Sequence, residues 1–247
     1  MAKSSSTLRL GLTFGVWVTL ALTSGCGLFS PTASLLDNER WALSDDSLVQ
    51  VVQDEDVLLL PQQVAPRTGI IFYPGGKVQP QAYAPLLRPL AREGYLVVVP
   101  VMRQDLAILS KDRAMDVREM YPEIEQWVLA GHSLGGTVAT GHALDEGDYA
   151  AVLLLAAYPT QRRYPEDGPP TLLLFGTEDG LVTADDRLRA QRLLPPRSDL
   201  QLIAGANHAQ FGAYGAQAED GIATILPAEQ WRISQEAMLD FLDHLGL

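Results

Sequence analysis

Cysteine, histidine and positive charge are all scarce in this chain of 247 residues. Cys26 is the single cysteine, which excludes an internal disulfide. The 18 basic residues are outnumbered by 30 acidic ones, and the net charge of -12 disfavours nucleic acid as a partner. The four histidines form no sequence cluster with cysteines or carboxylates at metal-ligand spacing, so we expect neither a metal nor another cofactor.

Long apolar runs are also scarce, and the one that stands out lies near the N-terminus. Lys3 and Arg9 form a basic segment before an uncharged, mostly apolar run over residues 10–23, a pattern that is typical of a secretory leader. The run is short for a membrane span. Residues 22–26 read Leu-Thr-Ser-Gly-Cys and resemble a bacterial lipobox. The resemblance implies a lipoprotein signal peptide over residues 1–25, lipidation of Cys26, and an exported protein anchored to the bacterial cell envelope. An uncleaved membrane anchor is the alternative.

The remaining chain has the composition of one globular domain, with 47% hydrophobic and 19% charged residues and no internal repeat. Residues 26–46 contain Ser30, Pro31 and Thr32 and show no clear period. We therefore expect a tether over residues 26–46 and a domain over residues 47–247.

Short apolar runs alternate with helical patterns along this domain. Strands are predicted at residues 48–52, 57–60, 69–73, 96–99, 127–130, 150–156, 171–175 and 200–203, the first two as an antiparallel hairpin at the sheet edge. Helices are predicted over residues 83–91, over 111–121 with Ser110 as N-cap, after residue 133, between residues 183 and 195, and over 228–245. This alternation predicts an α/β fold with a mostly parallel central sheet and helices on both faces.

The strand at residues 127–130 runs directly into Gly131-His132-Ser133-Leu134-Gly135, a GxSxG pattern. Its flanking glycines suit a very tight strand-to-helix turn, where a Cβ would collide with neighbouring backbone. The helix that follows aims its first N–H groups at the same point and favours negative charge there. Ser133 is therefore the predicted nucleophile, and an ordinary strand-to-helix turn is the alternative.

Two further side chains follow later strands. Asp179 lies in Gly-Thr-Glu-Asp-Gly after residues 171–175, and His208 lies in Gly-Ala-Asn-His after residues 200–203. Since reactive groups gather at the carboxyl ends of parallel strands, we expect both to meet Ser133. His208 is the predicted general base by elimination, because the other histidines adjoin the serine or lie on helices. These are His132, His142 and His244.

A carboxylate is needed to hold the imidazole of His208 in the right tautomer. Asp179 is the predicted partner because it sits just past a strand between small, turn-forming residues. Glu178, Asp185 and Asp186 are its rivals, and the last two are more simply explained as charges at a helix N-terminus.

Acyl transfer also needs N–H donors for the developing oxyanion. We expect one from the backbone of Leu134 and the other from the turn Gly75-Gly76, where we favour Gly76. The same turn is no P-loop, since the longer glycine spacing and the Ser/Thr after Lys77 are missing.

Over residues 48–245 the chain resembles α/β-hydrolases, and in particular the small capless bacterial branch related to dienelactone hydrolases. The matching segments are Tyr-Pro-Gly-Gly, Gly-His-Ser-Leu-Gly-Gly, Gly-Thr-Glu-Asp-Gly and Asn-His-Ala-Gln-Phe-Gly. The resemblance implies an α/β-hydrolase fold without a cap domain, and a serine esterase that acts on a small-molecule ester through an acyl-enzyme on Ser133. Dienelactone hydrolases use a cysteine at this position, so their substrate does not carry over.

Other functions stay open. The same triad serves acyltransferases and peptidases, and a ligand-binding lipoprotein on a hydrolase fold would need no triad at all. The loop over residues 158–170 is too short for a cap, so we expect an open mouth with Phe211 and Tyr214 as apolar walls. Lys77, Arg162 and Arg163 lie on loops at this edge and would favour an anionic substrate, unless they are ordinary solvated charges.

Overall fold

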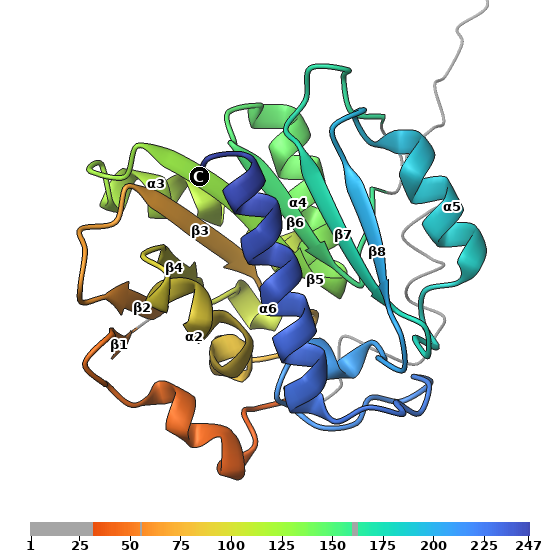
Figure 1. Ribbon diagram of the computed structural model, residues 1–247, viewed down its shortest axis with the longest axis horizontal. Helices are drawn as coiled ribbons and strands as arrows, with labels where there is room; N and C mark the ends of the chain where they lie inside the picture. The colour runs from red at the N-terminus through yellow and green to blue at the C-terminus, as the bar shows by residue number, and fades with distance from the viewer. Residues whose placement is uncertain (1–31, 55, 160–162) are drawn as a thin grey trace, which may run out of the picture. The chain divides into compact units, whose positions relative to one another are not determined.

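The structure is a computed structural model that describes residues 32–54, 56–159 and 163–247 (Figure 1). The chain divides into a short N-terminal unit that ends at Pro31 and a main unit, Thr32–Leu247. The predicted leader, Cys26 and Arg162 lie outside the described residues. No helix in the described part of the chain is both long enough and apolar enough to span a membrane.

An eight-stranded sheet forms the centre of the main unit, in the order β1-β2-β4-β3-β5-β6-β7-β8. The strands are β1 (Val49–Gln53), β2 (Val57–Pro61), β3 (Thr68–Tyr73), β4 (Leu96–Val99), β5 (Gln126–His132), β6 (Ala151–Leu155), β7 (Thr171–Gly176) and β8 (Asp199–Ile203). β1 and β2 are antiparallel, β2 pairs antiparallel with β4, and all other pairs are parallel. The predicted mostly parallel sheet with an antiparallel edge hairpin is confirmed.

The parallel strands β3 to β7 are buried on both faces because helices cover both sides of the sheet. The α-helices are α2 (Ala84–Arg92), α3 (Arg113–Met120), α4 (Ser133–Glu146), α5 (Ala184–Leu193) and α6 (Pro227–His244). The 3₁₀ turns are η1 (Asp37–Leu43), η2 (Pro80–Tyr83), η3 (Arg103–Asp105), η4 (Ala107–Leu109) and η5 (Ala209–Phe211). In Figure 1, α2 and α6 lie in front of the sheet, and α3 and α4 lie behind it.

Alternate residues of each central strand enter two separate cores. On β3, Phe72 packs with the core under α2 and α6, whereas Ile71 and Tyr73 pack with the core under α3, α4 and α5. These side chains are fully buried, and each one contributes roughly 1.5–3 kcal/mol to folding. The two cores fix the strand register, since a slip by one residue would exchange the faces.

The segment before β1 packs on the domain. Ala33 bridges to Val78, and Leu36 N–H donates to Ala213 O over 2.9 Å. Further along, the buried guanidinium of Arg88 on α2 donates to Ala42 O and pairs with Asp46. Apolar side chains join these polar contacts, since Ala42 is fully buried and Leu35 and Leu43 pack against the core under α2 and α6.

Helix α3 begins later than predicted. Asp112 holds the N-cap position, and no side-chain hydrogen bond caps the helix. Ser110, the predicted cap, instead accepts a hydrogen bond from the backbone N–H of Arg103. Its hydroxyl therefore stabilises the preceding loop rather than the helix, and the Ser110 prediction is wrong.

Candidate active site

Ser133 stands at the junction of β5 and α4, with a φ of 51° that non-glycine residues rarely adopt. Close backbone packing holds the turn in this strained conformation, which costs about 1–3 kcal/mol. A Cβ at Gly135 would overlap the carbonyl oxygens of Tyr73 and Pro74, and one at Gly131 would lie 2.7 Å from the backbone nitrogen of Gly136. The glycines thus allow the strand and the helix to meet at this angle, and they leave the serine partly exposed.

His208 and Asp179 meet at the carboxyl edge of the sheet. The Nδ1 atom of His208 lies 3.0 Å from Asp179 Oδ2, and the two side chains are 3% and 0% exposed. An ionised carboxylate only accepts hydrogen bonds, so Nδ1 is the donor, and Nε2 of the neutral ring carries the lone pair. That Nε2 atom is buried and has no hydrogen-bond partner among the described residues.

Backbone groups hold the Asp179 carboxylate in place. Its other oxygen accepts hydrogen bonds from the N–H groups of Leu181 (2.8 Å) and Val182 (2.9 Å). None of the rival acids makes the His208 contact. Glu178 is exposed and accepts from Thr177, Asp185 is exposed, and Asp186 forms a capping box with Thr183 at the start of α5.

Asp220, which no sequence pattern singled out, joins the two loops that carry this pair. Its Oδ1 accepts from the backbone N–H groups of Gly180 and His208, both at 3.2 Å, and its Oδ2 accepts from Ala209 at 2.8 Å. One carboxylate therefore fixes the residue after Asp179 and the backbone of His208 together. Its segment has no regular period, so the acidic residue itself was the only available signal.

The turn after β3 leaves one N–H group unused. Gly75 N–H donates to the hydroxyl of Tyr83 over 2.8 Å, and Lys77 N–H donates to Asp105 O over 2.7 Å. Gly76 N–H makes no hydrogen bond within the described residues. A Cβ at Gly76 would lie 3.0 Å from the side chain of Leu134, so this turn adjoins the first turn of α4.

His132 lies beside the pair instead of pointing into solvent. Its ring is 1% exposed, and its centroid is 4.8 Å from that of His208. Burial, together with the neighbouring His208, lowers the pKa of His132 well below its usual value near 6.5. Its ring therefore stays neutral and can accept one hydrogen bond while it donates another.

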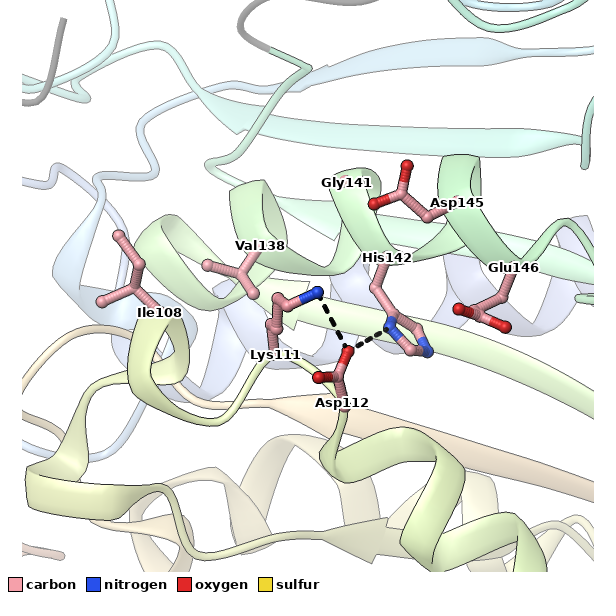
Figure 2. Close-up of a pocket in the computed structure, with 8 residues that line it drawn as sticks. All are labelled: Ile108, Lys111, Asp112, Val138, Gly141, His142, Asp145 and Glu146. Atoms are coloured by element: carbon pink, nitrogen blue, oxygen red, sulfur yellow. Dashed lines mark ion pairs between the residues drawn. The ribbon is translucent and has the colours of Figure 1, made fainter. Parts of the chain in front are cut away.

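The two remaining histidines lie away from this edge. His142 is buried on α4, where its Nε2 lies 2.9 Å from the Tyr149 hydroxyl, and His244 is exposed in the last turn of α6. His142 borders a pocket of about 270 Å³ with Lys111, Asp112 and Glu146 (Figure 2). Among the described residues, no group of three or more histidine, cysteine or acidic side chains could hold a metal ion.

The expected walls of the mouth are only partly present. Phe211 is fully buried and packs in the core under α6, so its prediction as an open apolar wall is wrong. Phe211 was predicted to line the mouth because it lies three residues after His208. The 3₁₀ turn η5 instead directs its ring into the core. Tyr214 is half-buried, Lys77 is partly exposed, and Arg163 is exposed.

The sequence matches the pattern of the Alpha/beta hydrolase family over residues 69–232, and the chain belongs to this family. The match spans β3 to the first turns of α6 and includes Ser133, Asp179 and His208. No curated protein matches the chain.

Solved structures share the fold at low sequence identity. A candidate dienelactone hydrolase from Klebsiella pneumoniae is 15% identical, with a TM-score of 0.57, and the match covers 75% of this chain and 91% of that one. Est1E from Butyrivibrio proteoclasticus is 13% identical, with a TM-score of 0.56, and the match covers 79% of this chain and 99% of that one. The ferulic acid esterase from Streptomyces cinnamoneus is 20% identical, with a TM-score of 0.56, and the match covers 74% of this chain and 68% of that one. At these identities, the likeness establishes the fold alone.

Proposed function

We propose that the protein is a serine hydrolase that cleaves a carboxylic ester, with Ser133 as nucleophile, His208 as general base and Asp179 as its carboxylate partner. The buried and unpaired Nε2 of His208 is the observation that carries this proposal. Leaving a buried polar atom without a partner costs about 1–3 kcal/mol, and a catalytic base needs such a vacant atom. The names of the structural relatives, which include an esterase, are in keeping with this chemistry.

The reaction runs in two halves. Ser133 Oγ attacks the ester carbonyl carbon while His208 Nε2 takes the hydroxyl proton, and the tetrahedral intermediate then expels the alcohol, which receives that proton. Water attacks the resulting acyl-enzyme, His208 accepts its proton, and Ser133 leaves with that proton as the free acid is released. We assign the N–H groups of Leu134 and Gly76 to the oxyanion, because Gly76 N–H has no other partner among the described residues and adjoins Leu134.

A fluorophosphonate probe tests the proposal, since only an activated serine forms the adduct. We expect the wild-type protein to be labelled on Ser133, and Ser133→Ala and His208→Ala to be unlabelled. His142→Ala and His244→Ala are the matched controls and should be labelled like the wild type. Undiminished labelling of His208→Ala would show that another group activates the serine. A wild-type protein that resists the probe would favour a ligand-binding role.

Water as the acyl acceptor separates the esterase from a transferase or peptidase with the same residues. A panel of esters that differ in acyl-chain length and charge measures the preference for the ester substrate. The same assays with and without added alcohols or amines measure the preference for the acyl acceptor. Faster product formation with an added acceptor than with water would identify a transferase. We also propose that lipidated Cys26 anchors the enzyme to the cell envelope, on the basis of the lipobox resemblance.

A further inference from the structure

A row of hydrogen bonds connects the turn after β3 with the loop of His208. Gly75 N–H donates to Tyr83 Oη over 2.8 Å, Tyr83 Oη lies 2.9 Å from His132 Nδ1, and His132 Nε2 lies 3.1 Å from the carbonyl oxygen of His208. All of these side chains are buried, at 2% exposure or less. The row therefore runs through the protein interior, from the neighbour of Gly76 to the backbone of His208.

The direction of each bond follows from the chemistry of its ends. The carbonyl oxygen of His208 can only accept, so His132 Nε2 carries the proton and Nδ1 of the neutral ring carries the lone pair. Tyr83 must then donate its hydroxyl proton to Nδ1, and its oxygen remains free to accept from Gly75 N–H. Every donor in the row has one acceptor, so the three bonds are mutually consistent and reinforce one another.

Close packing around Gly75 and Tyr83 restricts this arrangement. A Cβ at Gly75 would lie 2.9 Å from both His132 Nδ1 and Tyr83 Oη. The Tyr83 ring also packs against Phe72, with the two centroids 4.8 Å apart. A glycine at position 75 is thus needed for the row to close, which is a reason for this glycine separate from any contact with substrate.

We propose that Tyr83 and His132 are positioning residues that set the direction of Gly76 N–H relative to His208. The inference rests on the proposed function, because it assigns a task to residues around that same site. Tyr83 occupies Gly75 N–H and so leaves Gly76 N–H as the donor that faces the substrate. His132 ties this turn to the loop of the base, so that the oxyanion donor and the base keep a fixed separation.

Tyr83→Phe removes the hydroxyl and retains the ring. We expect kcat to fall about 10- to 100-fold with KM within about 2-fold, because a misdirected donor weakens the transition state more than the bound ester. Inhibition by an alkyl boronic acid, whose adduct on Ser133 is tetrahedral and anionic, should weaken by a similar factor. The hydrogen bond from Ala213 N–H to Ala82 O, 2.7 Å long, does not involve the Tyr83 hydroxyl, so we expect it to hold these two segments together in the variant.

Tyr149→Phe is the matched control, since Tyr149 and His142 form a second buried hydroxyl–imidazole contact, also at 2.9 Å. It should lose a similar amount of stability and keep wild-type kcat and boronate affinity. For His132, Gln retains one donor and one acceptor whereas Leu retains neither, so His132→Gln should keep more activity than His132→Leu. Hydrogen exchange of the peptide that spans residues 74–79 should accelerate in Tyr83→Phe and not in Tyr149→Phe.

The outcomes separate this inference from the proposed function. Absence of fluorophosphonate labelling in the wild type would overturn the proposed function. Hydrogen exchange would still test whether Tyr83 and His132 hold the turn after β3 to the loop of His208. If the wild type is labelled but Tyr83→Phe matches Tyr149→Phe in kcat, boronate affinity and exchange, the positioning role is overturned and the esterase proposal stands.

Discussion

His208 and Asp179 are joined by a 3.0 Å hydrogen bond between two side chains that are almost completely sealed from solvent. They come from loops that follow different strands, β8 and β7, and meet only because those strands are parallel neighbours. The bond fixes the proton on Nδ1 and leaves Nε2 free, which is the tautomer that a general base for Ser133 requires.

Asp179→Asn should preserve the fold and lower kcat/KM by about 10⁴-fold, because the amide group can favour the wrong tautomer of His208. Ester hydrolysis measured alongside circular dichroism checks this. Asp185→Asn, on an exposed residue at the start of α5, is the control and should be nearly silent. A damaging Asp185→Asn with a mild Asp179→Asn would reverse the assignment of the acid.

Asp220→Asn should also impair turnover, although Asp220 has no place in the reaction itself. The amide replaces one carboxylate oxygen by an NH₂ group that faces backbone N–H donors, so the contact with Gly180 and His208 or with Ala209 is lost. We expect kcat to fall about 10- to 100-fold because the base is displaced. Glu219→Gln, on the exposed neighbouring residue, should leave kcat unchanged, and equal effects of the two variants would rule out a loop-fixing role.

Two glycines of α4 should respond in opposite ways to alanine. Gly135→Ala forces a Cβ into backbone carbonyls and should destabilise the protein by about 1–3 kcal/mol or more and abolish phosphonate labelling. A methyl group added at Gly141 would meet nothing within 4 Å, so Gly141→Ala should stabilise the helix by about 0.5–1 kcal/mol. Urea unfolding of both variants measures the change in the free energy of unfolding. An increase in Gly135→Ala would contradict the tight turn.

Stability should fall as the pH drops below about 6.5, since burial lowers the pKa values of His132 and His142. Between the lowered and the ordinary pKa, the unfolded chain binds more protons than the folded one, so the free energy of unfolding decreases toward acid. His132→Gln should reduce this slope below about pH 6.5 by the contribution of one titrating group. His244→Gln, on an exposed residue, is the control, and an unchanged slope in His132→Gln would argue against a neutral buried ring.

Cys26→Ala should release the protein from the membrane fraction or leave its leader uncleaved, because the acyl chains are the proposed attachment. Fractionation followed by mass spectrometry of the N-terminus measures both. Normal processing together with full membrane retention would eliminate the lipobox proposal.

The regular part of the fold could be predicted because its signal is local. Apolar runs such as residues 69–73 marked strands to within a residue or two, and the alternation with helices indicated the parallel sheet. That sheet in turn indicated that the loops after β5, β7 and β8 converge, which is the basis of the prediction that Asp179 and His208 act with Ser133. The structure does bring Asp179 and His208 into contact.

What was missed depends on contacts between distant segments. Residues 32–46 pack on the domain through scattered apolar side chains and through contacts such as that of Arg88 with Asp46. Asp220 acts through backbone N–H groups of two other loops. His132 was set aside because it adjoins Ser133, yet the same tight turn directs its ring inward between Tyr83 and His208. No periodicity in the sequence encodes any of these relationships.

The early packing of the chain limits the reach of the proposed anchor. Thr32 Oγ1 donates to Asp105 over 2.6 Å, and Ala33 N–H donates to Lys77 O, one residue beyond Gly76. Only residues 27–31 separate this point from Cys26, and such a segment spans roughly 20 Å at full extension. If Cys26 is lipidated as proposed, this short segment would hold the turn at Gly75-Gly76, which the proposed function assigns to the oxyanion, within a few tens of ångströms of the bilayer surface. Esters that partition into the membrane would then reach the proposed site over a shorter path than esters dissolved far from it.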